Sequence, residues 1–267
     1  MRALPIMMFV AGSLVLAAAC GADDPIGGGD DASAPVDASA PADASPPDAN
    51  LDPFSFFVTS LQTMREQSGS QDGFGGDLGG LSGADTICQT AAANVGFGHR
   101  TWRAFLSATT GGPGGGPVHA IDRIGEGPWH DRNGRLISND RAGLLGTRPA
   151  GDAQAVADMA DEFGQPLSLL GDSHDIMTAS DEAGTLFSSN PVTTCYDWTS
   201  AVGPGSEQAV ICGHSFPRSA QTGREWIADH PLRGCAPGIN LIQDGPGSGD
   251  CVGCSGGYGG IYCFAAD

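Results

Sequence analysis

The chain has 267 residues, of which 31 are acidic and 12 are basic, so its formal net charge at pH 7 is −19. All of the bases are arginine, because the sequence contains no lysine. So acidic a chain repels other polyanions, which excludes nucleic acids, heparin-like polymers and anionic membrane surfaces as expected partners. After residue 20 no apolar run is long enough to span a bilayer, so we expect membrane attachment only through the N-terminus.

Residues 1–19 have the pattern of a secretory signal peptide. Arg2 gives a positive start, an apolar run extends to Leu16, and three alanines precede Cys20. This ending resembles the lipobox of bacterial lipoproteins, in which the cysteine is lipidated and becomes the mature N-terminus, although Leu16 lies one position early. We expect lipidation of Cys20, since a lone cysteine there has little other use. The alternative is cleavage after Ala19 by an ordinary signal peptidase, which would give a secreted protein.

Residues 20–52 predict a disordered tether between the lipid and a folded domain. They consist almost entirely of Ala, Asp, Pro, Gly and Ser, which cannot bury enough apolar surface to offset the entropy of ordering. Gly21 stands where an aspartate retains lipoproteins in the inner membrane of some bacteria, so we expect an outer-membrane lipoprotein that faces outward. The remaining residues 53–267 have the length of one large domain or of two small ones, and we expect one domain.

The clearest element is a helix followed at once by a strand. Ser82 and Asp85 have the spacing of a capping box, which predicts that the helix begins at Ser82. Apolar residues then recur at helical spacing, at Ala84, Ile87, Cys88, Ala91, Ala92 and Val95. Gly96 and Gly98 are expected to end the helix. The alternation of Trp102, Ala104 and Leu106 with their neighbours predicts the strand.

Shorter signals predict the rest of the domain. Strands are expected at 56–60, 176–180 and 261–264, and a turn at Asn133-Gly134 that leads into another strand. A short acidic helix is expected within 152–163, with Val156, Met159 and Phe163 facing inward, and a tight surface loop at 253–260. Short strands, one clear helix and long glycine-rich loops predict an α+β domain and not a parallel α/β sheet.

The eight cysteines behind a signal peptide indicate an oxidising compartment and disulfide bonds. Setting Cys20 aside leaves seven, so at least one thiol of the domain stays unpaired within it. Cys251 and Cys254 have the spacing of a zinc knuckle, but no second pair of that kind accompanies them. Because exported cysteines tend to be oxidised, we favour disulfides over a zinc site here.

The helix–strand segment GADTICQTAAANVGFGHRTWRAFLS, at 83–107, resembles the corresponding segment of endostatin, the C-terminal domain of certain collagens. The sequence TCYDW at 194–198 is similar to that family's Cys-x-x-Trp, and IYCF at 261–264 to its last strand. The same landmarks mark a family of uncharacterised bacterial surface lipoproteins, which is the closer match for a chain with a lipobox. The resemblance implies the C-type lectin-like (endostatin-like) fold, with two short helices and a small twisted antiparallel sheet that holds the N- and C-terminal strands side by side.

The resemblance also implies a set of disulfides. Cys88 would pair with Cys263 and join the helix to the last strand. Cys195 would pair with Cys254, or alternatively with Cys251. The additional pair would be Cys212–Cys235, which leaves Cys251 odd.

The departures from the family limit what function the resemblance implies. Calcium-dependent sugar binders of this fold use Glu-Pro-Asn or Gln-Pro-Asp followed by Trp-Asn-Asp, and the nearest matches here, at 190–191 and 197–198, lack a dense set of oxygen ligands. The N-terminal zinc histidines and the arginine patch of endostatin have no counterpart. We therefore expect no metal and no cofactor. The preferred hypothesis is a surface-displayed lectin-like domain that recognises a glycan or an extracellular protein, such as a matrix protein, without calcium.

Candidate binding residues lie in the C-terminal half of the domain. Trp198 and Trp226 are predicted to be core residues; an exposed one would form a sugar-stacking platform beside Asp197, Arg218 or Arg224. The remaining candidates are three histidines and an aspartate, namely His174, Asp175, His214 and His230.

These four residues define the alternative hypothesis, a secreted and metal-dependent hydrolase. They could form a zinc site, or a histidine could activate Ser215. No spacing supports either idea, so the simpler interpretation is that the imidazoles hydrogen-bond loop backbone and that the protein is not an enzyme. A purely structural envelope lipoprotein is the third possibility.

Overall fold

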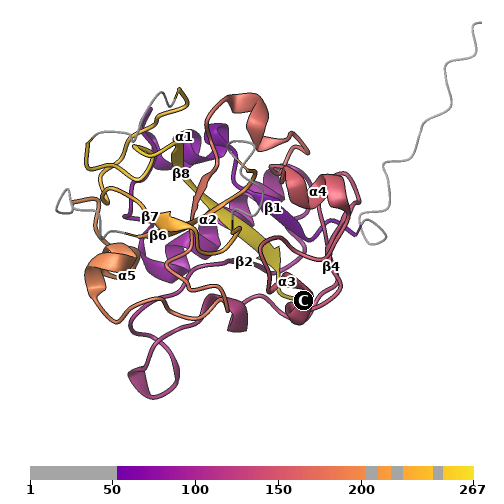
Figure 1. Ribbon diagram of the computed structural model, residues 1–267, viewed down its shortest axis with the longest axis horizontal. Coiled ribbons are helices and arrows are strands. Elements are labelled where there is room, and N and C mark those ends of the chain that lie inside the picture. Colours follow the sequence, from indigo (N-terminus) through magenta and orange to yellow (C-terminus); the bar gives the residue numbers. More distant parts are fainter. Residues whose placement is uncertain (1–52, 203–209, 218–224, 243–248) are drawn as a thin grey trace, which may run out of the picture. The chain divides into compact units, whose positions relative to one another are not determined.

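The computed structural model describes residues 53–202, 210–217, 225–242 and 249–267, shown as coloured ribbon in Figure 1. The predicted signal peptide, Cys20 and the tether lie outside the described residues, as do Arg218 and Arg224. Within the described part of the chain, no helix is long and apolar enough to cross a bilayer.

Short strands and short helices alternate along the described chain, which confirms the α+β class. The strands are β1 (Phe56–Val58), β2 (Trp102–Ala104), β3 (Trp129–His130), β4 (Leu136–Ser138), β5 (Asp175–Met177), β6 (Ile211–His214), β7 (His230–Pro231) and β8 (Gly257–Ala265). The α-helices are α1 (Leu61–Ser68), α2 (Gly80–Asn94), α3 (Arg141–Leu144), α4 (Ala153–Ala157) and α5 (Cys195–Trp198). Single 3₁₀ turns lie at Pro113–Gly115, Ala120–Asp122, Leu167–Leu170 and Pro191–Thr194.

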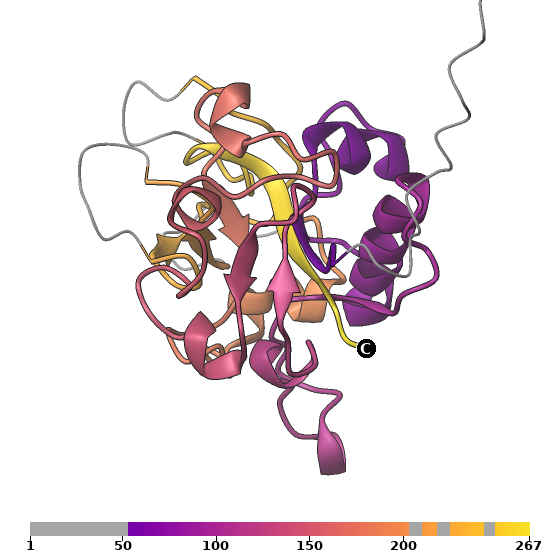
Figure 2. The ribbon, with the colours of Figure 1, turned by 90° about the vertical axis from the view of Figure 1, so that its right-hand side faces the viewer.

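The last strand, β8, organises the main sheet. The sheet has the order β1-β8-β5-β6-β7, and β2 pairs with the C-terminal part of β8. Both β1 and β2 run antiparallel to β8, whereas β5 runs parallel to it. In Figure 2 the yellow β8 lies between the indigo helices α1 and α2 on one side and most of the remaining chain on the other. The first and last strands of the domain are therefore neighbours.

The helix–strand unit is present, but the predicted helix start is wrong. Helix α2 begins at Gly80, and its N-cap is Gly79, in the left-handed region at φ 75°. Asp85 does not cap the helix, because its carboxylate accepts a hydrogen bond from the Ala104 amide (2.9 Å) and pairs with Arg123 (2.8 Å). Asp85 thus joins α2 to β2. The end of the helix agrees with the prediction, since Gly96 follows it at φ 92°.

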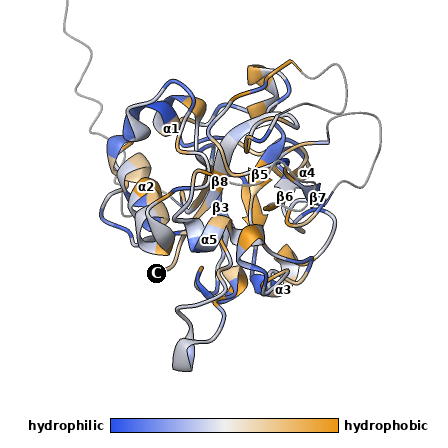
Figure 3. Cartoon of the chain, turned by 90° about the vertical axis from the view of Figure 1, so that its left-hand side faces the viewer, coloured by the Kyte–Doolittle hydropathy of each residue, from blue (hydrophilic) through white to orange (hydrophobic). Residues whose placement is uncertain are grey.

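The predicted bridge between helix and last strand is confirmed. Cys88 on α2 and Cys263 on β8 form a disulfide, and both residues are fully buried. Around it the core is aromatic, with the Trp102 ring 5.0 Å from the Phe57 ring between centroids. In Figure 3 α1 is mostly hydrophilic in colour, and only Leu61, Thr63 and Met64 of this helix are buried.

The other implied disulfides are wrong. Cys195 pairs with Cys235, and Cys251 pairs with Cys254, so neither Cys195–Cys254 nor Cys212–Cys235 forms. The glycines at 75–76 let the chain pass close to both partners of the first bridge, because a Cβ on Gly76 would lie 2.3 Å from the Cys195 sulfur. Cys212 is the buried thiol left over, since β6 directs it away from these loops and toward His230.

Secondary structure and burial test three smaller predictions, for a helix within 152–163, a surface loop at 253–260 and two core tryptophans. Within 152–163 only α4 is helical, and Phe163 is 45% exposed instead of inward. The predicted surface loop at 253–260 is wrong, because Gly257 onward belongs to β8 and is buried. Trp198 and Trp226 are confirmed as core residues, each with no exposed surface and with its indole N–H donating to a backbone carbonyl.

Candidate metal centre

The three strands at one end of the main sheet bring the candidate histidines together. Asp175 of β5 lies directly opposite His214 of β6, and Cys212 of β6 lies opposite His230 of β7. Directly paired residues share a face, and residues two apart on one strand share a face as well. The strand register therefore places Asp175, His214, Cys212 and His230 on the same face. His174, just before β5, completes the group.

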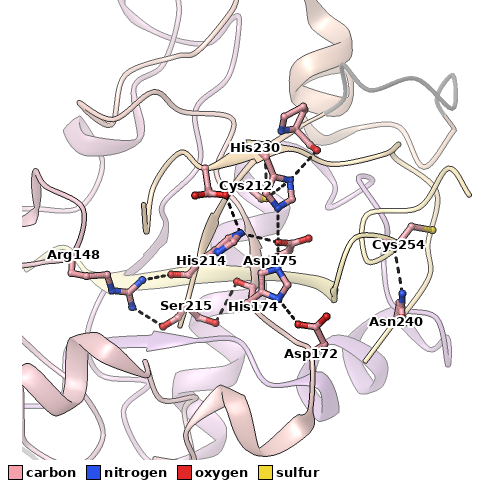
Figure 4. Close-up of polar contacts among 12 residues, drawn as sticks. Arg148, Asp172, His174, Asp175, Cys212, His214, Ser215, His230, Asn240 and Cys254 are labelled. Atoms are coloured by element: carbon pink, nitrogen blue, oxygen red, sulfur yellow. Dashed lines mark hydrogen bonds and ion pairs between the residues drawn. The ribbon is translucent and has the colours of Figure 1, made fainter. Parts of the chain in front are cut away.

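The side chains of His174, Asp175, His214 and His230, here called the His–Asp cluster, converge on one carboxylate oxygen. Oδ1 of Asp175 lies 3.0 Å from Nε2 of His174, 3.1 Å from Nε2 of His230 and 3.4 Å from Nε2 of His214. One donor atom from each of the four residues lies within 4.8 Å of all the others. Figure 4 shows the three rings around the Asp175 carboxylate.

The His–Asp cluster is almost entirely shielded from solvent. His174, Asp175 and His214 are at most 1% exposed, and only the His230 side chain is partly open, at 29%. Among the described residues, the Asp175 oxygens and both His214 nitrogens have no partner at hydrogen-bond geometry. Buried polar atoms without such partners cost free energy unless charge interactions with their neighbours offset it.

Contacts on the outer side of two rings turn their Nε2 atoms inward. Nδ1 of His174 lies 2.7 Å from Oδ1 of Asp172, and Nδ1 of His230 lies 3.1 Å from the Pro231 carbonyl oxygen. A proton on Nδ1 that is shared with such an oxygen leaves Nε2 with a lone pair that faces the centre. Carboxylates and carbonyls in these positions orient the histidine ligands of metals in the same way.

The charges of the His–Asp cluster are coupled. Burial alone would raise the pKa of Asp175, but the three imidazoles outweigh burial and hold that pKa well below its usual value. Burial lowers the pKa of His214. Burial also opposes protonation of His230, yet Asp175 outweighs it and raises the pKa of His230 to about 9. Without an ion, a proton on His230 thus balances the buried carboxylate.

The remaining predicted site residues do not join this group. Asp197 accepts hydrogen bonds from Thr109, Thr110 and Thr194, which fix the turn around α5. The Ser215 hydroxyl contacts the His174 carbonyl oxygen at 3.4 Å and forms no described hydrogen bond to an imidazole, so a serine–histidine pair is not present in the described residues. Arg218 and Arg224 lie outside them.

Sequence reasoning missed three neighbours of the His–Asp cluster. Asp172 touches His174, Oδ2 of Asp229 lies 3.3 Å from Nε2 of His214, and the Cys212 sulfur lies 3.6 Å from Nδ1 of His230. The only signal for the two aspartates was their position one or two residues before a histidine.

No protein-family model and no curated protein matches this chain.

Proposed function

We propose that this domain binds one divalent transition-metal ion, zinc or a close chemical relative, through His174, Asp175, His214 and His230. The observation that carries this proposal is the convergence of three imidazole Nε2 atoms on a single buried carboxylate oxygen. It replaces the expectation of a metal-free domain, which rested on the departures from the family pattern and on sequence spacing. The pairing of the strands brings these four residues together, although their spacing in the sequence does not indicate a site.

The distances support a small ion of this class. Ligands about 2.0–2.1 Å from a tetrahedral zinc ion lie roughly 3.3–3.4 Å from one another. The oxygen–nitrogen distances of 3.0, 3.1 and 3.4 Å are close to that separation. Small side-chain rotations would therefore admit the ion, which would replace the proton on His230 as the counter-charge to Asp175.

The donor types exclude the hard cations. Three imidazole nitrogens and one carboxylate oxygen suit zinc and its neighbours in the first transition row. Calcium and magnesium prefer shells of oxygen atoms, which the His–Asp cluster does not offer. The proposal therefore agrees with the sequence-based expectation that the domain works without calcium.

The test is calorimetric titration of the chelator-treated protein with zinc chloride at neutral pH. We expect one zinc per chain, and His214→Ala should weaken binding at least 100-fold because it removes a ligand. The matched control is His99→Ala, since His99 lies outside the His–Asp cluster and should not matter. Circular dichroism of each variant checks that it folds. Equal affinity of His214→Ala and the unchanged protein would refute the site.

We also propose that the domain has the C-type lectin-like fold. The supporting features are the pairing of the first and last strands and the Cys88–Cys263 bridge that joins α2 to β8. Recognition of a glycan or extracellular protein stays a prediction, as do the lipid anchor at Cys20 and the outer-membrane location. Neither Trp198 nor Trp226 provides a sugar-stacking platform, because both are buried.

A further inference from the structure

Of the three disulfides in the described residues, Cys251–Cys254 is the most accessible to solvent. Cys251 is half-buried and Cys254 is 9% exposed, whereas the four cysteines of the other two bridges are at most 1% exposed. The exposed Gly249 packs against the Cys254 sulfur, because a Cβ at this glycine would lie 3.0 Å from Sγ. Glycine has no side chain that would cover that sulfur, so an external thiol meets less protein here than at either core bridge.

The backbone around this bridge is held by contacts that do not need the disulfide. The Cys254 amide donates to the Cys251 carbonyl at 3.2 Å, and the buried Val252 between them donates to the Ala236 carbonyl at 3.0 Å. In Figure 4 the side-chain amide of Asn240 lies beside Cys254, and it donates to the Cys254 carbonyl at 3.4 Å. The bridge spans only three residues, so breaking it frees little chain. The turn should therefore keep its place when the sulfurs separate.

The surroundings of the pair favour Cys254 as the sulfur that leaves as a thiolate. The backbone amide of Cys251 donates to Sγ of Cys254 at 3.2 Å. Arg233 brings a positive charge to the same segment, with its Nε 3.3 Å from the Gly249 carbonyl oxygen. The opposing charge of Asp250 is exposed, so solvent screens it. Hydrogen-bond donors and cations stabilise a thiolate, and a stabilised thiolate leaves faster. Attack is therefore favoured at Cys251, which is also the more exposed of the two.

We propose that Cys251–Cys254 is a redox site that takes two electrons from an external small dithiol while the domain stays folded. One thiolate of the dithiol attacks Sγ of Cys251, the bond between the two protein sulfurs breaks, and Cys254 leaves as a thiolate. The second thiolate of the dithiol then attacks the dithiol sulfur of the mixed disulfide and releases Cys251. The dithiol becomes a disulfide, and the two cysteines take up the two protons that it lost. An external disulfide reverses the same steps, and none of them depends on the proposed metal centre.

The test is reduction of the folded, chelator-treated protein with dithiothreitol, followed by alkylation of free thiols and mass spectrometry of the peptides. We expect Cys251 and Cys254 to be reduced at least about 100-fold faster than the cysteines of the core bridges, which react only when the core opens. The buried free thiol of Cys212 is the internal control, because its alkylation reports opening of the domain. Circular dichroism should not change, and oxidised glutathione should restore the bridge. Equal rates for all three bridges, or reduction only with loss of structure, would overturn the proposal.

Single substitutions test the assigned order of attack. With oxidised glutathione, the Cys254→Ser protein should form a mixed disulfide at Cys251 at least roughly 10-fold faster than the Cys251→Ser protein does at Cys254. Arg233→Gln should slow reduction of the intact pair several-fold. Arg141→Gln is the matched control, because Nε of Arg141 also binds a backbone carbonyl, that of Gly125, outside this segment. Equal rates for the two serine variants would overturn attack at Cys251.

Discussion

The carboxylate of Asp172 is the contact that fixes one proposed ligand in its orientation. Its Oδ1 lies 2.7 Å from Nδ1 of His174, on the side of the ring opposite Asp175. Carboxylates placed in this way typically account for 10–100-fold in metal affinity. A half-buried aspartate two residues before a proposed histidine ligand would thus belong to the proposed site without touching the ion.

Asp172→Asn should therefore weaken zinc binding roughly 10–100-fold while the domain stays folded. Asp152→Asn is the matched control, because Asp152 caps α4 and does not touch the His–Asp cluster. Both affinities are measured by calorimetric titration. An Asp172→Asn protein with unchanged affinity would mean that the carboxylate does not orient His174.

The carboxyl group of Asp161 leads to a second prediction for a single residue, namely how the stability of the fold depends on pH. Burial raises its pKa to about 6, helped by the charge of Glu162 and opposed by the amides of Gln165, Phe163 and Gly164. The pKa of Asp161 is higher in the folded state than in the unfolded state. Between about pH 4 and 6 the folded protein therefore binds more protons at this group than the unfolded protein does. Stability from this group is therefore greatest at low pH and is lost as pH rises through about 6.

Asp161→Asn should remove this dependence. The free energy of unfolding of the unchanged protein, relative to the variant, should fall by about 2–3 kcal/mol between pH 4 and pH 7.5. Urea denaturation at the two pH values measures the difference. A difference that does not change with pH would contradict the raised pKa.

At the scale of elements, β6 must lie very close to the chain that follows it. A Cβ on Gly213 would lie 1.7 Å from the Trp226 carbonyl oxygen, which is backbone and cannot move aside. This contact sets the position of His214, the next residue. The absence of a side chain at Gly213 is therefore a requirement of the site.

Gly213→Ala should lower the free energy of unfolding by about 3 kcal/mol and weaken zinc binding, since β6 would have to shift. Gly116→Ala is the control, because a Cβ there would meet nothing closer than 3.4 Å. Thermal unfolding and zinc titration of both variants check this. An unaffected Gly213→Ala protein would show that β6 does not pack as described.

The disulfides differ in the length of chain that they close. The separations are 175 residues for Cys88–Cys263, 40 for Cys195–Cys235 and 3 for Cys251–Cys254. Chain entropy then gives contributions of about 5, 4 and 1.6 kcal/mol. The Cys195–Cys235 bridge also anchors four consecutive residues with left-handed backbone angles, Cys195–Trp198. This conformation costs free energy in residues other than glycine.

Paired serine substitutions should therefore destabilise the domain in that order, as measured by thermal unfolding. Loss of the Cys251–Cys254 bridge should cost least. The order would be contradicted if loss of this short bridge cost more than loss of Cys88–Cys263.

The elements that could be predicted from sequence are those with local patterns. Helix α2 and strand β2 follow from spacing, and the Cys88–Cys263 bridge follows from the family resemblance. The predicted capping role of Asp85 is wrong because its partners, Ala104 and Arg123, are distant in sequence. The His–Asp cluster depends on the register of strands two to four residues long. Such short strands carry too little periodicity to reveal which residues pair. Their histidines could be named as candidates, but their convergence could not be derived.

At the scale of the whole domain, the main sheet separates architecture from the proposed chemistry. Strands β1 and β2, which run antiparallel to β8, and the Cys88–Cys263 bridge tie α2 and both ends of the domain to β8. The His–Asp cluster lies on β5, β6 and β7, farther along the same sheet. Because β5 pairs directly with β8, binding an ion should stabilise the fold as a whole.

This coupling predicts a shift in thermal unfolding. Zinc at 100 times its Kd should add about 2.7 kcal/mol to the free energy of unfolding, which corresponds to a rise in Tm of roughly 5–10 °C. Differential scanning calorimetry with and without zinc measures the shift. Calcium at the same concentration is the control and should produce none.

The most direct test of the account is the zinc-edge X-ray absorption spectrum of the zinc-loaded protein. The account predicts one zinc per chain, bound only by nitrogen and oxygen at about 2.0–2.1 Å, with the multiple scattering of three imidazoles. A sulfur ligand near 2.3 Å, which would implicate Cys212, or a protein that retains no stoichiometric zinc would contradict it.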